Sequence, residues 1–126
     1  MKNLIPKISC ILPVYNSEKT LDRCLRSIYT QECKVDEIVV VDNDSKDNTK
    51  QIINLWKQYL PIKYFKNDQN KGLSFSLQRA INESKGELIL RIDSDDRWES
   101  NHVEEILKLY KENDAVLFST KSQYLS

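Results

Sequence analysis

The chain has 126 residues but few glycines, prolines, cysteines or histidines, and its formal net charge is zero. Its two glycines, Gly72 and Gly86, are too far apart for the glycine-rich loops that hold dinucleotides or nucleoside triphosphates. One histidine, His102, and three cysteines without a C-x-x-C spacing do not form a usual zinc ligand set. We expect Cys10 and Cys24, at apolar positions, to be reduced core residues. These shortages exclude dinucleotide-binding loops and P-loop chemistry, and they argue against a zinc site of the usual ligand set.

Charge and hydropathy exclude two further classes of protein. The 19 basic and 19 acidic residues are intermixed, so the chain offers no basic stripe to hold a nucleic acid. No apolar run approaches the roughly 18 residues that span a bilayer. Residues 1–7 lack the apolar stretch and the cleavage site of a signal peptide. We therefore expect a cytoplasmic protein with no nucleic-acid partner.

Strand-like and helix-like hydrophobic patterns alternate along the whole chain. Runs rich in β-branched residues predict strands at 8–12, 37–42, 62–65, 88–92 and 115–118. Apolar stripes between them predict helices, the first two beginning after Ser17 and Ser45 and the third ending near Gly86 as its C-cap. The apolar helix positions are Leu21, Cys24, Leu25, Ile28, Ile52, Ile53, Trp56, Tyr59, Leu60, Leu73, Leu77, Ala80, Ile81, Val103, Ile106, Leu107 and Tyr110. Strict alternation predicts one α/β domain over residues 1–126, with a Rossmann-like, mainly parallel sheet and helices on both faces.

Polar residues follow the first four predicted strands, where ligands bind in open α/β sheets. The fourth strand is followed by Asp93, Asp95 and Asp96, three carboxylates that repel one another unless a cation joins them. Mg²⁺ or Mn²⁺, with its preference for oxygen ligands, fits such a cluster. Taken alone, this string also fits a solvated acidic turn with Asp96 as a helix cap.

Two other strand ends add groups suited to a nucleotide. Tyr15 offers an aromatic face for a base, and Asp42 and Asn43 offer hydrogen-bonding groups for a base edge or ribose hydroxyls. Each alone also fits an ordinary loop aromatic or a turn and helix cap. Together with the acidic string they describe a site for a nucleoside diphosphate.

These residues carry a family resemblance that covers about residues 8–118. The matching segments are Pro13-Val14-Tyr15-Asn16, Asp42-Asn43-Asp44-Ser45-x-Asp47, Asn70-Lys71-Gly72-Leu73-Ser74 and Asp93-Ser94-Asp95-Asp96. In this order and spacing they resemble the N-terminal, donor-binding part of a family 2 glycosyltransferase with the GT-A fold. The resemblance implies a chain truncated at its C-terminal end.

The resemblance implies a role for each matching residue. Pro13 and Tyr15 would lie beside the base, Asp42 and Asn43 would contact base and ribose, and Asp93 would also contact the nucleotide. Asp95 and Asp96 would hold Mg²⁺ or Mn²⁺ at the diphosphate. Lys71, or nearby Arg79, would counter phosphate charge or contact the base.

The resemblance also implies an activity, a donor and an acceptor. It implies transfer, with inversion, of a sugar from a nucleoside diphosphate to a glycan or lipid-linked acceptor in the synthesis of cell-surface polysaccharide. Any contact with the inner face of the membrane would come from parts outside this chain.

The sequence departs from the family pattern at three points. Asn43 stands where the family often has a second aspartate, which leaves a uridine or a deoxythymidine donor open. Asp44 stands where the family often has glycine, so we expect a left-handed backbone there. The family's catalytic base lies downstream of the acidic string, and no acidic residue between Trp98 and Ser126 is a convincing substitute.

Two alternatives belong to other classes. A phospho-acceptor receiver domain has a similar length and alternation, but it needs an acidic pair directly after its first strand, where this chain has Pro13-Val14-Tyr15-Asn16. A catalytically inert nucleotide-binding module would share the whole pattern.

Overall fold

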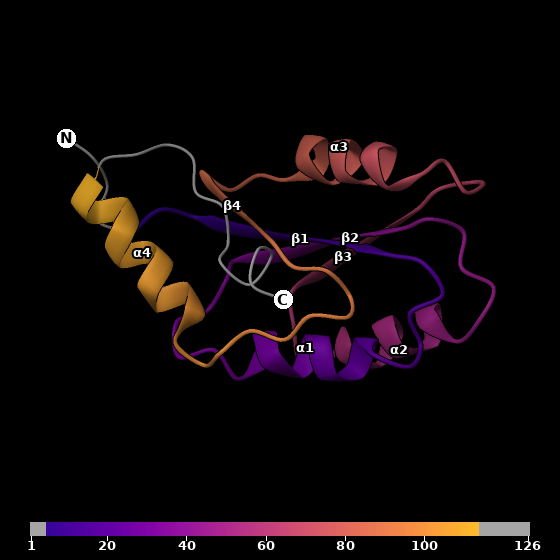
Figure 1. The fold of residues 1–126 in the computed structure, drawn as a ribbon, viewed down its shortest axis with the longest axis horizontal. Coiled ribbons are helices and arrows are strands. Elements are labelled where there is room, and N and C mark those ends of the chain that lie inside the picture. Colours follow the sequence, from indigo (N-terminus) through magenta and orange to yellow (C-terminus); the bar gives the residue numbers. More distant parts are fainter. Residues whose placement is uncertain (1–4, 114–126) are drawn as a thin grey trace.

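The computed structural model describes residues 5–113, which form a four-stranded parallel sheet in the order β3-β2-β1-β4 (Figure 1). The strands are β1 (Ile8–Val14), β2 (Glu37–Asp42), β3 (Ile62–Lys66) and β4 (Leu88–Arg91), and the helices are α1 (Leu21–Tyr29), α2 (Thr49–Trp56), α3 (Leu73–Glu83) and α4 (His102–Asn113). The predicted alternation and parallel sheet are confirmed. The strand predicted at 115–118 lies outside the described residues. No helix within residues 5–113 combines the length and apolar character needed to cross a membrane.

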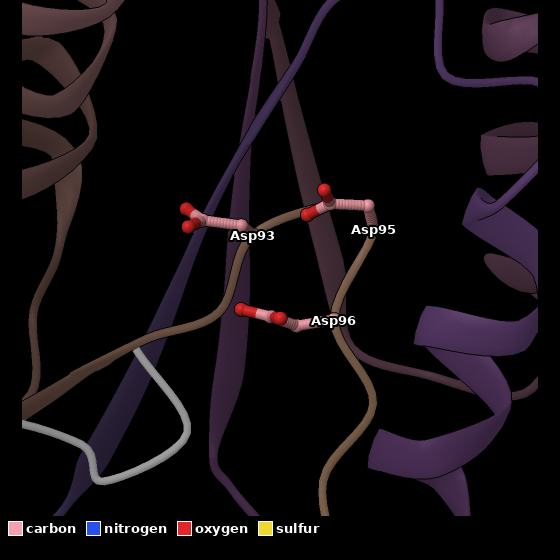
Figure 2. Close-up of side chains that lie close together, drawn as sticks. All are labelled: Asp93, Asp95 and Asp96. Atoms are coloured by element: carbon pink, nitrogen blue, oxygen red, sulfur yellow. The ribbon is translucent and has the colours of Figure 1, made fainter. Parts of the chain in front are cut away.

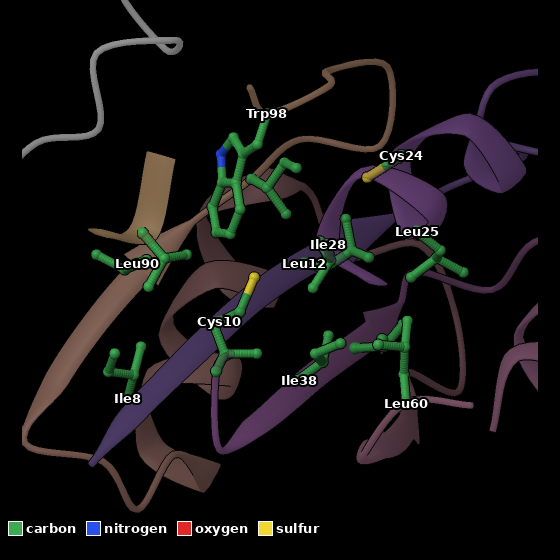
Figure 3. Packing of buried hydrophobic residues seen from close by; sticks show 14 of the residues in the cluster. Ile8, Cys10, Leu12, Cys24, Leu25, Ile28, Ile38, Leu60, Leu90 and Trp98 are labelled. Carbon is green, nitrogen blue, oxygen red and sulfur yellow. The ribbon is translucent and has the colours of Figure 1, made fainter. Parts of the chain in front are cut away.

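The strands bury apolar side chains on both faces of the sheet, as the near-continuous apolar runs predict. On one face, Cys10 and Leu12 of β1 pack with residues of α1, α2 and α4 (Figure 3). On the other face, Ile11 packs with β2 residues and with Ala80 of α3. Figure 1 shows α3 on one side of the sheet and α1 and α2 on the other, so the predicted two-sided covering is confirmed. Cys10 and Cys24 are buried and free, as expected.

The first two helices begin later than predicted. α1 starts after Thr20 and α2 after Asn48, so Ser17 and Ser45 are not their N-caps. The reason is that both serine hydroxyls are used by other loops: Ser45 Oγ accepts the Asn16 N–H at 2.8 Å, and Ser17 Oγ lies 2.8 Å from Ser94 Oγ.

Three predicted core positions proved to be exposed. Leu73 and Ile81 of α3 are 53% and 44% exposed, because this helix buries the smaller Ser76 and Ala80 against the sheet. Tyr59 is 60% exposed because α2 ends three residues before it.

Gly86 is not a C-cap, since α3 ends at Glu83 and is followed by Ser84. Its N–H instead donates to Ser9 Oγ at 2.7 Å, and a Cβ at this position would stand 2.6 Å from Ser9 N. The absent side chain lets the loop before β4 approach β1 closely.

Glu37 is a buried carboxylate at the amino edge of the sheet. It accepts hydrogen bonds from Ser9 Oγ and from the Lys85 N–H, each at 2.6 Å, and forms an ion pair with Lys63 at 2.7 Å. Burial alone would raise the pKa of Glu37, but the contacts with Lys63, Ser9 and Lys85 outweigh it and lower this pKa from 4.5 to about 2. The charged carboxylate therefore ties β1, β2, β3 and the loop before β4 together.

This depressed pKa predicts acid sensitivity. The contribution of Glu37 to stability is present above its unfolded-state pKa of 4.5 and is lost as the pH falls toward 2. When the pH is lowered from about 5 to about 3, the free energy of unfolding of the wild type should fall. We expect this fall to be smaller in Glu37→Gln, by on the order of 1–2 kcal/mol. Urea unfolding at both pH values measures this. Glu83→Gln, at the exposed end of α3, should keep the wild-type slope, and equal slopes for all three proteins would contradict the assignment.

Candidate functional site

A cavity of about 400 Å³ lies at the carboxyl edge of the sheet. Its lining joins residues from the end of β1, the end of β2, the start of α3 and the loop after β4. They are Pro13, Val14, Tyr15, Asn43, Asn70, Gly72, Leu73, Ser76, Arg91, Asp93, Ser94 and Asp95. Five of the eight predicted binding residues are in this set, and Asp42, Lys71 and Asp96 are not.

The loop after β1 presents Tyr15 to this cavity. Its side chain is 48% exposed, so part of the ring is accessible. The following residue, Asn16, has a positive φ of 47°, and its Oδ1 accepts the Lys46 N–H at 2.8 Å. Asp44 has a φ of 70°, which confirms the left-handed backbone expected there. Asn16 thus holds the loops after β1 and β2 against each other through its contacts with Ser45 and Lys46.

The acidic trio of Asp93, Asp95 and Asp96 lies on the loop after β4, with the three side chains close together (Figure 2). One oxygen of each carboxylate lies within 4.8 Å of those of the other two. Burial first, and then the charges of Asp93 and Asp95, raise the pKa of Asp96. Arg91 offsets one charge through its Nε, 2.9 Å from Asp93 Oδ1. Such a set of oxygens matches the ligands that a hard divalent cation takes.

The trio is not a helix cap. The Asp96 N–H closes a turn on the Asp93 carbonyl at 2.9 Å, and α4 begins only at His102. The Cys24 Sγ–H contacts the same carbonyl at 3.5 Å, which fastens the acidic loop to α1.

Asn43 joins the end of β2 to the loop that precedes α3. Its Nδ2 donates to Asn70 Oδ1 at 2.8 Å, while its Oδ1 accepts the Asn67 Nδ2–H at 3.0 Å and the Lys71 N–H at 2.8 Å. An aspartate could accept the last two bonds but could not donate to Asn70. Asn43 therefore shapes one wall of the cavity through its neighbours. Gly72, with a φ of +89°, completes this wall.

Asp42 is buried away from the cavity. Its carboxylate accepts the Ser45 N–H at 2.9 Å and the Tyr64 hydroxyl at 2.6 Å. Burial and then the bond to Asp42 raise the pKa of Tyr64. The structure gives Asp42 partners within the protein, and its contact with a nucleotide stays a prediction.

Lys71 and Arg79 border a separate hollow of about 310 Å³ beside Phe75. The Lys71 ammonium lies 3.4 Å from Asp68, and Arg79 donates to Asn67 Oδ1 at 2.9 Å. The cation that lines the main cavity is Arg91. Sequence reasoning missed Arg91, Asn70 and Ser76, although residues 70–72 belong to one of the matching segments.

Most of the chain is similar to known proteins of one family. Residues 9–124 match the family described as Glycosyl transferase family 2. A GalNAc(5)-diNAcBac-PP-undecaprenol beta-1,3-glucosyltransferase of Campylobacter jejuni is 33% identical over 90% of this chain and 38% of its own length. A UDP-Gal:alpha-D-GlcNAc-diphosphoundecaprenol beta-1,3-galactosyltransferase of Escherichia coli is 32% identical over 90% of this chain and 42% of its own. The chain thus spans less than half the length of these relatives.

Solved structures agree with the fold. TarS of S. aureus, residues 1–349, superposes with a TM-score of 0.81 at 31% identity, covering 86% of this chain and 33% of that one. A mannosyltransferase of Pyrobaculum calidifontis, in complex with GDP-Man and Mn²⁺, gives 0.79 at 25% identity, covering 86% and 33%. The predicted GT-A fold is confirmed, and the chain belongs to glycosyltransferase family 2.

Proposed function

We propose that this chain is the donor-binding part of a glycosyltransferase that moves a sugar from a nucleoside diphosphate to a glycan or lipid-linked acceptor. The observation that carries the proposal is that one cavity is bordered both by the accessible ring of Tyr15 and by the acidic loop of Asp93 and Asp95. A base and a diphosphate need these two different environments at a short separation. The product would enter cell-surface polysaccharide, in line with the undecaprenol-linked acceptors for which the two relatives are named.

Tyr15 is the residue that we assign to the base. Stacking of a base on an aromatic ring contributes about 1–3 kcal/mol. Pro13, which is buried at the end of β1, and Asn43 hold the walls on either side. Structures of TarS are known with UDP and with UDP-GlcNAc, which supports a uridine donor, while deoxythymidine stays open.

Asp95 and Asp96 are the residues that we assign to Mg²⁺ or Mn²⁺. Asp93, which lines the same cavity and already has Arg91 as a partner, is the acid that we assign to the nucleotide. A bound divalent cation would offset the negative charge that develops on the departing diphosphate. The structure of the P. calidifontis mannosyltransferase with GDP-Man and Mn²⁺ supports this assignment.

Transfer with inversion also needs a carboxylate base for the acceptor hydroxyl. Among residues 5–113, the acids that line the cavity are Asp93 and Asp95, and we assign both to donor binding. Glu104 and Glu105 lie in the first turn of α4 and do not line it. We therefore assign the base to none of the described residues.

An undecaprenol-linked acceptor would place the reaction at the inner face of the membrane.

Nucleotide binding tests the proposal. We expect UDP or dTDP to bind at least about tenfold more tightly with Mn²⁺ than without it, a difference of about 1.4 kcal/mol in calorimetric titration. Asp95→Ala should abolish this gain, whereas Glu104→Ala on α4 should preserve it. Tyr15→Ala should weaken binding with and without metal, because it removes the stacking surface.

Three outcomes would contradict the proposal. Binding of equal strength with and without Mn²⁺ would indicate an inert nucleotide-binding module. Metal-dependent phosphorylation by a small phosphodonor would indicate a receiver domain. Equal effects of Asp95→Ala and Glu104→Ala would show that the acidic loop takes no part in metal-assisted binding.

The raised pKa of Asp96 predicts that removal of its charge stabilises the metal-free protein but weakens the stabilisation that a bound metal provides. In metal-free buffer at neutral pH, Asp96→Asn should raise the melting temperature by roughly 2–5 °C, because it removes a charge that is disfavoured by burial and repelled by Asp93 and Asp95. The same variant should lose most of the stabilisation that Mn²⁺ gives the wild type. Thermal unfolding followed by circular dichroism measures both effects. Asp68→Asn, which changes an exposed acid elsewhere, should leave the Mn²⁺ effect intact, and a destabilised metal-free Asp96→Asn would contradict the reasoning.

A further inference from the structure

A second recess, of about 350 Å³, lies on the outer side of α1 and α2. Its lining consists of Asp22, Arg26, Tyr29, Leu55, Trp56 and Tyr59. None of these residues lines the donor cavity, which α3 borders from the other side of the sheet (Figure 1). The family motifs do not include any of them. The recess therefore needs an explanation of its own.

Three aromatic rings form the apolar part of this recess. Tyr29, Trp56 and Tyr59 have ring centroids 5.9 to 6.0 Å apart, and their planes are inclined to one another by 60° to 74°. Trp56 is only 9% exposed, whereas Tyr29 and Tyr59 are 44% and 60% exposed. The indole is thus the floor and the two phenol rings are walls. Steeply inclined rings enclose a hollow where coplanar rings would give a flat patch.

The rim of the recess carries a paired acid and base. Asp22 Oδ1 accepts the Trp56 Nε1–H at 3.0 Å, and its Oδ2 lies 3.1 Å from Arg26 Nη2. The guanidinium also lies over the Trp56 ring, 5.7 Å from its centroid. Both side chains are more than half exposed, so unused lone pairs and N–H groups face solvent. Within residues 5–113, no hydrogen bond engages the hydroxyl of Tyr29 or Tyr59.

This combination fits one class of ligand better than others. A pyranose ring has C–H groups on its faces and hydroxyls around its edge. The C–H groups favour the negative face of an aromatic ring, and the hydroxyls pair with carboxylate and guanidinium groups. The volume lies in the range of small-molecule sites, which are mostly apolar with a few oriented polar groups. Among the residues that line the recess, the acid Asp22 and the base Arg26 neutralise each other, so the lining favours a neutral sugar over an anionic one. Lys34 stands outside this lining, with its ammonium 5.4 Å from the centroid of the Tyr29 ring.

We propose that the recess between α1 and α2 binds a neutral pyranose of a glycan. This inference goes beyond the proposed function, because the recess takes no part in holding the donor. A flat, net basic surface would have favoured a membrane, and an exposed apolar stripe without paired charges would have favoured a second copy of the chain. The concave shape and the balanced rim favour the sugar.

The two tryptophans of the chain provide the readout. In ¹H–¹⁵N NMR spectra each indole gives one signal, and Trp56→Phe identifies that of Trp56. We expect galactose, N-acetylglucosamine or lactose at millimolar concentration to shift the Trp56 signal saturably, because the indole N–H is held by rim residue Asp22. The signal of Trp98, which is 3% exposed in the core, should stay in place.

Matched variants separate the recess from the rest of the surface. Tyr59→Ala should weaken the response at least about tenfold, which is about 1.4 kcal/mol. Ile81→Ala, which removes an exposed apolar side chain from α3, should not change it. The wild type, Tyr59→Ala and Ile81→Ala should bind UDP with the same affinity. Failure of this inference would therefore leave the proposed function untouched.

The proposal is overturned if none of the three sugars shifts the Trp56 signal saturably, or if the shift persists in Tyr59→Ala. It is also overturned if the signal responds only to vesicles of anionic phospholipid or only to protein concentration. Those results would assign the recess to a membrane or to a second copy.

Discussion

The parallel pairing of β1 with both β2 and β4 is the constraint on which the candidate site depends. Parallel strands end at the same edge, so this pairing brings Tyr15, Asn43 and the acidic loop together from distant parts of the chain. β4 stops at Arg91 opposite Ile11, well before β1 ends, and the Ile92 N–H still bonds to the Ile11 carbonyl at 3.1 Å. The acidic loop therefore begins beside β1, and its Ser94 Oγ lies 2.8 Å from Ser17 Oγ in the loop that follows β1. This offset places the carboxylates next to the tyrosine loop.

The alternation of side chains along β2 explains why Asn43 lines the cavity and Asp42 does not. Val41 packs on the face covered by α3, and Val40 on the face covered by α1 and α2. Successive residues point to opposite faces of a strand. Continuing that order, Asn43 follows Val41 to the α3 side, where the cavity lies, and Asp42 follows Val40 to Tyr64. The two polar residues that a motif treats as a pair are thus divided by the sheet.

Much of the fold could be predicted because buried strands and amphipathic helices leave strong periodic signals. The same signals misplaced the helix starts, because Ser17 and Ser45 use their hydroxyls for contacts between loops that periodicity does not report. They also overstated the buried face of α3, where Ala80 lets the helix approach the sheet and leaves Leu73 and Ile81 in solvent. The site residues were found because they directly follow predicted strands, have suitable chemistry and lie in the segments that match the family. Arg91 was missed because a basic residue that ends a strand has no distinctive spacing.

Carboxylates at the two edges of the sheet have opposite electrostatic surroundings. At the amino edge, the carboxylate of Glu37 has a lysine, a hydroxyl and a backbone N–H as partners, and its pKa falls. At the carboxyl edge, three carboxylates share the neighbourhood of Arg91, and the pKa of Asp96 rises. A satisfied charge stabilises the fold on its own, whereas a group of repelling charges gains stability only from a ligand of opposite sign. The proposed binding of a cation at the carboxyl edge would therefore stabilise the domain, whereas Glu37 at the amino edge stabilises it without a ligand.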